Sequence, residues 1–477
     1  MSSACAEGSY PLRMNVHPFR AITYSKHAPT SDLSSLVAPP YDVLDAAAKR
    51  ALLERDPANI VGIDLPHVPP KELGPPEEYQ KAAERFRAMM KDGTLSKSHD
   101  PVMFAYRQTF TGADGKTKVK RSGMACCIDL LPFGPRAGGG VLPHEETFSG
   151  PKQDRMALMQ ATKAQLSPIF GLHADGHGAA NALVGRVMAS RGGVPDRTAT
   201  TADGTLHELW TISDRATIEA YQHALAGEDV FIADGHHRYT TALNYFQKEI
   251  ASCGAKLAHD HPAAQCMVVL VGMSDPGLVI WPTHRVLGGM ADYSFEKFAK
   301  AAEKLLIIRP AADQKALAGI EREMNSATIP PHPLPRNVFG LYDFETGRSY
   351  TATLAQADPL VKTHPTKPEA WRKLDVAIIQ HAIVEGICQP ALNRSQSVKW
   401  AFPHSIAEIE AIARDAHGDA GESPDTGAAG FAQLAIVVRP TPLDAVRDIS
   451  RANVLMPQKS TFFYPKLATG LFVHGLE

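Results

Sequence analysis

The chain has 477 residues, a length that predicts two or three domains. Its 44% of hydrophobic and 21% of charged residues are typical of a globular protein, and its formal net charge of −2 gives no whole-chain attraction to nucleic acid or to a membrane surface. No segment approaches the about 20 apolar residues that a membrane-spanning helix needs, and the first residues lack the apolar core of a secretory signal. We therefore expect a cytoplasmic protein without a membrane partner.

The six cysteines form no CxxC pair. Cys126 and Cys127 are adjacent on an expected strand, so their side chains point to opposite faces of the sheet. This pattern argues against a zinc cage or a disulfide framework, and it favours the reduced thiols of a cytosolic protein.

Periodicity and turn residues predict helices and strands along the whole chain. A short strand that enters a Pro-Pro turn is expected over 36–44, and a β-hairpin over 102–130 around the turn residues 113–116. Helices are expected over 45–56 (with Asp45 as N-cap), 77–93, 151–163, 214–226, 237–251, 295–306, 313–325, 369–386 and 442–453, and further strands over 230–233, 267–272, 278–282, 337–344 and 431–439. Residues 416–430 are expected to form a surface loop. This succession predicts an α/β or α+β fold with a mixed sheet.

The clearest candidate site begins where a short apolar strand ends at Asp234 and a helix follows. Gly235 permits a tight turn with positive φ. The unpaired amides at the start of a helix bind anions, and three further donors, His236, His237 and Arg238, lie in the first turn. We expect this turn to bind phosphates, and Asp234 to hold a metal ion, orient a histidine or cap the helix. A plain helix cap with surface histidines is the alternative.

A second candidate lies at the end of another expected strand, at His144, Glu145 and Glu146. Either glutamate is a candidate general base toward a hydroxyl group, or a metal ligand. Adjacent side chains diverge, so we expect only one of the two glutamates to face the site. Exposed loop charges are the alternative.

Lys152, Asp154 and Arg155 form a third candidate, because they are expected in the first turn of a helix. A cation is unfavourable there unless it has an anionic ligand or pairs with the aspartate. The sequence leaves both explanations open.

Lys459, Ser460, Thr461 and Lys466, near the C-terminus, resemble an anion-binding turn. They lack the glycine-rich loop of a Walker A motif. A lysine beside Ser and Thr is still suited to phosphate. A closing strand with exposed lysines is the alternative.

Several of these segments, in the same order, resemble a bacterial family filed as domain of unknown function 1015. They are HPFRAI (17–22), PPYDV (39–43), HEET (144–147), KxDR (152–155), DGHHRYTTAL (234–243) and KSTFFYPKLATG (459–470). The DGHHR segment is also similar to the phosphate-binding motif of the ParB/sulfiredoxin superfamily, which includes free-serine kinases. The resemblance implies a ParB/sulfiredoxin-like nucleotide-binding core over 121–290, flanked by α/β segments over 1–120 and 291–477.

In those kinases a glutamate upstream of the motif is the base toward the serine hydroxyl, which implies this role for Glu145 or Glu146. The resemblance implies a phosphotransferase that uses ATP or ADP with Mg²⁺ and acts on a small hydroxylated metabolite, with free L-serine as the first candidate. The catalytic candidates are then Glu145, Glu146, Asp234 and His237, with Asp234 also as metal ligand. The nucleotide ligands are then Gly235, His236, His237, Arg238, Lys459, Ser460 and Thr461.

Two other functions stay open. A ParB-like protein that uses nucleotide to gate binding is one, although the near-neutral charge and the lack of a helix-turn-helix signature argue against nucleic acid as a partner. A metal-dependent hydrolase is the other, with His144, Glu145, Asp234, His236 and His237 as ligands. The sequence allows a homo-oligomer without indicating one.

Overall fold

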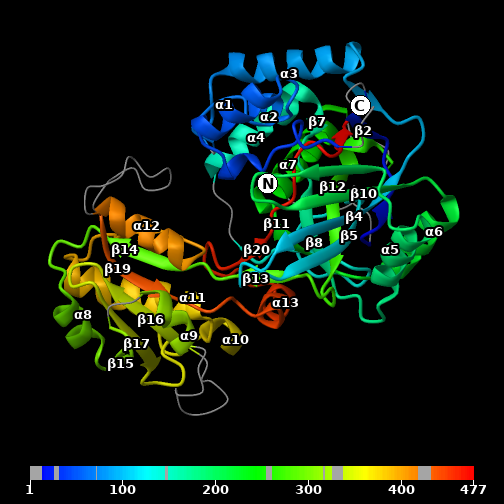
Figure 1. Cartoon of the computed structure of the whole chain (residues 1–477). Coiled ribbons are helices and arrows are strands. Elements are labelled where there is room, and N and C mark those ends of the chain that lie inside the picture. The colour runs from blue at the N-terminus through cyan, green and yellow to red at the C-terminus, as the bar shows by residue number, and fades with distance from the viewer. Residues whose placement is uncertain are drawn as a thin grey trace. The chain divides into compact units, whose positions relative to one another are not determined.

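The computed structural model describes residues 13–25, 32–70, 72–145, 149–253, 260–314, 317–324, 337–416 and 431–477. The chain divides into two compact units, of which unit 1 is Met1–Val279 with Phe463–Glu477 and unit 2 is Ile280–Phe462 (Figure 1). The expected boundary at residue 120 falls inside a hairpin whose strands pair along their length, so it does not separate two compact parts of unit 1. None of the described helices combines the length and the apolar character needed to cross a bilayer.

A nine-stranded mixed sheet is the centre of unit 1, in the order β6-β11-β8-β12-β5-β4-β10-β9, with β1 paired to β5. β6 is parallel to β11 and β8 is parallel to β12, whereas the other pairs are antiparallel. The strands are β1 (Val16–His17), β4 (Met103–Thr111), β5 (Lys118–Asp129), β6 (Val141–Leu142), β8 (Ile169–His173), β9 (Arg197–Thr200), β10 (Leu206–Ile212), β11 (Val230–Asp234) and β12 (Gln265–Gly272). The predicted mixed sheet is confirmed.

The hairpin predicted over 102–130 is β4 and β5. Its turn closes because Asp114 Oδ1 accepts hydrogen bonds from the amides of Lys116 at 2.9 Å and Thr117 at 2.8 Å. This turn sets the register of the two strands, in which Gln108 is paired with Arg121. The same register places Cys126 and Cys127 in the buried end of β5, where both thiols are free.

Seven helices are described in unit 1: α1 (Ala46–Arg55), α2 (Val61–Asp64), α3 (Pro76–Lys91), α4 (Ser149–Thr162), α5 (Ala179–Ser190), α6 (Arg215–Ala224) and α7 (His236–Cys253). Asp45 is the N-cap of α1, as predicted, and accepts a hydrogen bond from the amide of Ala48 at 2.7 Å. Helices α1 to α4 gather at one end of the unit, where α4 packs on α3 and α7 (Figure 1). Helix α5 packs on β4, β5, β10 and β12, and α7 packs on β8.

A second, four-stranded sheet of unit 1 joins distant parts of the chain in the order β3-β2-β21-β7. Its strands are β2 (Ala21–Tyr24), β3 (Leu95–Lys97), β7 (Ala164–Gln165) and β21 (Val473–Gly475). The strand predicted over 36–44 is wrong, because only Ala38 forms an isolated bridge and η2 (Tyr41–Val43) is a 3-10 turn. Pro39 and Pro40 have no amide hydrogen to donate to a neighbouring strand.

Unit 2 contains a six-stranded sheet in the order β15-β17-β16-β19-β14-β18. Its strands are β14 (Arg285–Gly288), β15 (Leu306–Pro310), β16 (Val338–Asp343), β17 (Arg348–Leu354), β18 (Lys399–Ala401) and β19 (Ala432–Val437). The helices include α8 (Phe295–Ala302), α9 (Ile320–Met324), α12 (Ile406–Ala416) and α13 (Leu443–Arg451). β13 (Val279–Trp281) and β20 (Phe462–Tyr464) lie where the chain passes between the units.

Two helices predicted for unit 2 differ from the structure. The one expected over 369–386 is divided into α10 (Glu369–Arg372), α11 (Asp375–Ala377) and the π-helix η5 (Ile378–Leu392), because Leu374 has an extended backbone with φ −68° and ψ 131°. The one expected over 313–325 is described only as the 3-10 turn η4 (Leu317–Gly319) and α9. Most of the loop predicted over 416–430 lies outside the described residues.

Candidate functional site

The sheet of unit 1 brings three segments to one edge. β6 and β11 are parallel, so the residues after both strands lie at the same edge. β8 is antiparallel to β11 and therefore begins there, with Phe170 opposite Asp234 in the register. Glu145, Asp234 and Pro168 thus come from three separate segments to the place where α7 begins.

Gly235 forms the turn between β11 and α7 with φ +96°, the positive value that was predicted. A Cβ atom at this position would lie 3.1 Å from the Arg238 guanidinium, which packs over the turn. The first amides of an α-helix have no acceptor within the helix. The structure confirms that α7 starts at His236, and anion binding by the first amides of this helix stays a prediction.

Asp234 is held between two cations. Arg238 Nη2 donates to one carboxylate oxygen at 2.5 Å, and Lys466 Nζ forms an ion pair with the other. Burial raises the pKa of Asp234, but Lys466 and Arg238 together outweigh burial and hold this pKa well below its usual range. Asp234 also interacts electrostatically with Arg121, which is 1% exposed. One carboxylate thus shares its surroundings with three cations.

The contacts of Arg238 and Asp234 bear on two expectations. The guanidinium of Arg238 already has acceptors within the protein besides Asp234, because its Nη1 donates to the Pro168 carbonyl at 2.5 Å. Both oxygens of Asp234 pair with cations, and the metal role expected for this residue stays a prediction. Among the residues that the structure describes, no group of three or more His, Cys, Asp or Glu side chains is arranged to hold a metal ion, including the set of the proposed hydrolase.

A buried histidine pair adjoins the first turn of α7. The His144 amide donates to His236 Nε2 at 3.3 Å, and the rings meet edge to face with their centroids 4.7 Å apart. Burial lowers the pKa of both imidazoles, and His144 lowers the pKa of His236 further. Both histidines are therefore neutral at pH 7, and the accepting Nε2 places the proton of His236 on Nδ1.

Glu145 reaches this histidine pair, since its Oε1 lies 3.7 Å from His144 Nε2. Glu146, the other candidate base, lies outside the described residues. His237 is half-buried in the first turn of α7, and its carbonyl accepts a hydrogen bond from Thr241 Oγ1 at 2.8 Å. The structure thus places Glu145 beside the histidine pair, and the choice between the two glutamates stays open.

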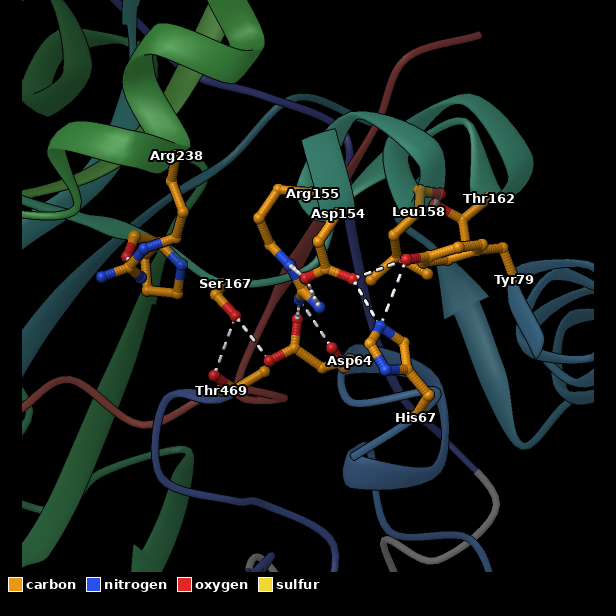
Figure 2. Close-up of polar contacts among 11 residues, drawn as sticks. Asp64, His67, Tyr79, Asp154, Arg155, Leu158, Thr162, Ser167, Arg238 and Thr469 are labelled. Carbon is orange, nitrogen blue, oxygen red and sulfur yellow. Dashed lines mark hydrogen bonds and ion pairs between the residues drawn. The ribbon is translucent and has the colours of Figure 1, made fainter. Parts of the chain in front are cut away.

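The third candidate segment is part of a buried ion network (Figure 2). Arg155 Nε donates to Asp154 Oδ2 at 2.8 Å, and its Nη1 donates to the Asp64 carbonyl at 2.6 Å. The guanidinium also covers the Tyr41 ring, 3.9 Å from its centroid. Asp64 accepts from Ser167 Oγ at 3.0 Å. Pairing with aspartates, one of the two explanations left open for this segment, therefore accounts for Arg155.

A small cavity of about 40 Å³ lies between Arg155 and Arg238, lined also by Asp64 and Ser167. One water molecule needs about 10–15 Å³ measured in this way, so the cavity has room for a few waters and not for a nucleotide.

The fourth segment is divided between the two units. Lys459, Ser460 and Thr461 belong to unit 2, where Arg285 Nη2 donates to the Lys459 carbonyl at 3.0 Å and the Ser460 hydroxyl donates to the Pro457 carbonyl. The nucleotide-binding role of these three residues stays a prediction. Lys466 belongs to unit 1 and pairs with Asp234.

Sequence reasoning missed Gln108, Arg121, Asp64 and Ser167. A signal existed for the first two, because the hairpin turn fixes their cross-strand pairing. No local pattern indicates Asp64 or Ser167, since their partners lie 91 and 103 residues away along the chain.

Solved structures similar to this chain include a free serine kinase in complex with AMP, with 9% identity and a TM-score of 0.31 over 68% of this chain and 83% of that chain. A variant of free serine kinase in complex with ADP has 10% identity and a TM-score of 0.30, over 68% and 83%. A conserved hypothetical protein from Pyrococcus furiosus has 10% identity and a TM-score of 0.29, over 68% and 86%. No curated protein matches the chain. The family described as Protein of unknown function (DUF1015) matches residues 16–377, and the chain belongs to this family.

Proposed function

We propose that this chain is a nucleotide-dependent phosphotransferase that acts on the hydroxyl group of a small metabolite. The observation that carries the proposal is the charge at the start of α7, where Lys466 and Arg238 both pair with Asp234. Two cations against one carboxylate, beside the positive end of a helix, attract a polyphosphate. The resemblance of the DGHHR segment to free-serine kinases supports ATP or ADP as the donor and L-serine as the first acceptor.

The roles of the residues follow from their positions. The first amides of α7 and Lys466 bind the phosphates, while Arg238 and Asp234 hold the turn in shape. Glu145 takes the proton of the acceptor hydroxyl as its oxygen forms a bond to the terminal phosphorus, and the bond from that phosphorus to the bridging oxygen breaks. The shortened nucleotide leaves with its new negative charge beside Lys466. Catalysis is then mainly positioning and charge neutralisation.

The proposal is tested with Lys466→Met and Arg238→Ala. Loss of the Lys466 contact to phosphate, or of the Arg238 contacts that hold the turn in shape, is expected to weaken ATP or ADP binding about 10- to 100-fold, measured by calorimetry and by the ligand-induced rise in Tm. Lys118→Met, at an exposed lysine of unit 1, is the matched control and should bind as the wild type does. Unchanged affinity of both site variants for every nucleotide would contradict the proposal.

Transfer is measured separately, by mass spectrometry of phosphoserine after incubation with ATP or ADP and L-serine. Glu145→Gln should lower the rate at least 100-fold and leave nucleotide affinity nearly unchanged, because a base acts on the acceptor. If the protein binds nucleotide but transfers phosphate to no hydroxylated acceptor, the result would favour a nucleotide-gated binding protein over a phosphotransferase.

A further inference from the structure

The segment that carries Lys466 is held by a buried pair of side chains on the β4–β5 hairpin. Arg121 Nη1 donates to the Tyr464 carbonyl at 2.9 Å, and its Nη2 donates to the Pro465 carbonyl at 2.6 Å. Gln108 Nε2 donates to the carbonyl of Lys466 itself at 2.9 Å. Three successive carbonyls are thus bound by two side chains that face each other across the hairpin.

The pair is connected within itself, because Arg121 Nη2 also donates to Gln108 Oε1. Both residues are 1% exposed. The amide of Gln108 is therefore oriented by the guanidinium, with its oxygen toward Arg121 and its nitrogen toward Lys466.

Burial of the charged side chain of Arg121 is unfavourable for the free energy of folding. In the part of the chain that the structure describes it has no carboxylate within ion-pair distance, and burial lowers its pKa to about 10, so it stays charged at neutral pH. Its charge is stabilised by carbonyl oxygens, by the Phe170 ring, whose centroid is 4.4 Å away, and by longer-range electrostatic interactions with Asp275 and Asp234. A buried charge without an ion pair is unfavourable for folding, and hydrophobic residues would fill the same space at lower cost.

We propose that Gln108 and Arg121 are positioning residues that place Lys466 on Asp234 and so set the positive charge of the phosphate site. The inference rests on the proposed function and extends it to two residues that touch neither Asp234 nor the first turn of α7. Arg121 also lies against Phe170, the register partner of Asp234, so the same side chain contacts the segment of Lys466 and the strand next to Asp234.

Gln108→Glu is the sharpest variant. A carboxylate there keeps an acceptor for Arg121 and supplies its missing ion-pair partner, but it has no donor for the Lys466 carbonyl. We expect the variant to fold and to bind ADP about tenfold more weakly, as Lys466→Met does. Because both changes act through one contact, the double variant should be no weaker than Lys466→Met alone.

Glu208→Gln is the matched control, because it breaks the bidentate Arg107–Glu208 pair of the same sheet, at 2.7 Å for both bonds, without touching residues 464–466. It should cost stability and leave ADP affinity unchanged. Additive losses in the double variant, or an equal loss in Glu208→Gln, would overturn the positioning role.

A second measurement separates this inference from the proposed function. Reductive methylation of the protein without nucleotide, followed by peptide mass spectrometry, reports how firmly Lys466 is held. We expect faster labelling of Lys466 in Gln108→Glu than in wild type or Glu208→Gln. Faster labelling with no effect of Lys466→Met on nucleotide binding would support the positioning role of Gln108 and Arg121 and reject the phosphate site. Unchanged labelling would reject the positioning role.

Discussion

Burial decides the charge of the two histidines beside the first turn of α7. His144 is 0% and His236 is 7% exposed, and they are packed against each other. The protein therefore stabilises neutral imidazoles at a place where it also gathers Lys466 and Arg238. Two further positive charges at this point would oppose those cations, so neutral histidines preserve the balance around Asp234.

This arrangement predicts that acid destabilises the protein. The folded pKa of His144 and of His236 lies below the unfolded value of about 6.5, so the unfolded state binds more protons as the pH falls below that value. Each histidine then lowers the free energy of unfolding by up to about 1.4 kcal/mol per pH unit. In His236→Gln, which keeps an acceptor for the His144 amide, this pH dependence should be weaker by about 1 kcal/mol per pH unit.

The measurement is urea unfolding at pH 7.5, 6.5 and 5.5. Other buried histidines contribute equally to wild type and variant, so the difference in slope reports position 236. His99→Gln, at a side chain that is 95% exposed, should keep the wild-type slope. Equal slopes for wild type and His236→Gln would show that His236 does not contribute to the pH dependence.

At the scale of elements, the junction of β11 and α7 was predictable because its determinants are neighbours in the sequence. An apolar strand, a glycine and a helix follow one another, and the structure has them at Val230–Asp234, Gly235 and His236–Cys253. The hairpin was predictable for the same reason. The partners of Asp234 were not, because Lys466 lies 232 residues away and only the sheet order brings the two together. Local patterns also failed at Leu374, where an extended backbone interrupts a helical pattern.

The junction makes a prediction for Gly235→Ala. A side chain at φ +96° is strained by about 1–3 kcal/mol, and the new Cβ would lie 3.1 Å from the Arg238 guanidinium. We expect the guanidinium to leave Asp234 and ADP affinity to fall about tenfold.

Gly115→Ala is a suitable control, since this hairpin glycine has φ +68° but no atom within 4 Å of an added Cβ. It should lose stability from backbone strain alone and bind ADP normally. Equal binding losses in the two variants would assign the effect to general destabilisation, and normal binding in both would mean that Arg238 does not depend on the glycine.

At the scale of the whole molecule, unit 1 is completed by residues from the far end of the chain. β21 pairs with β2 and with β7, and Phe463 and Phe472 are buried in unit 1. Lys466 belongs to the same returning segment. The phosphate site that we propose is therefore assembled only after the residues of unit 2 have been synthesised, whereas unit 2 is continuous in the sequence.

This difference predicts opposite outcomes for two fragments. A chain that ends at residue 462 loses Phe463 and Phe472, and loss of each buried phenylalanine costs about 3–5 kcal/mol. The sum is comparable to the whole stability of a typical domain, about 5–15 kcal/mol, so unit 1 should lose its cooperative unfolding transition. A fragment of residues 280–462 should fold by itself, since unit 2 is one continuous segment with its own six-stranded sheet and hydrophobic core. Circular dichroism during urea unfolding measures both outcomes. A cooperative transition of unit 1 in the truncated chain would show that unit 1 folds without the C-terminal segment. A 280–462 fragment without a cooperative transition would show that unit 2 does not fold by itself.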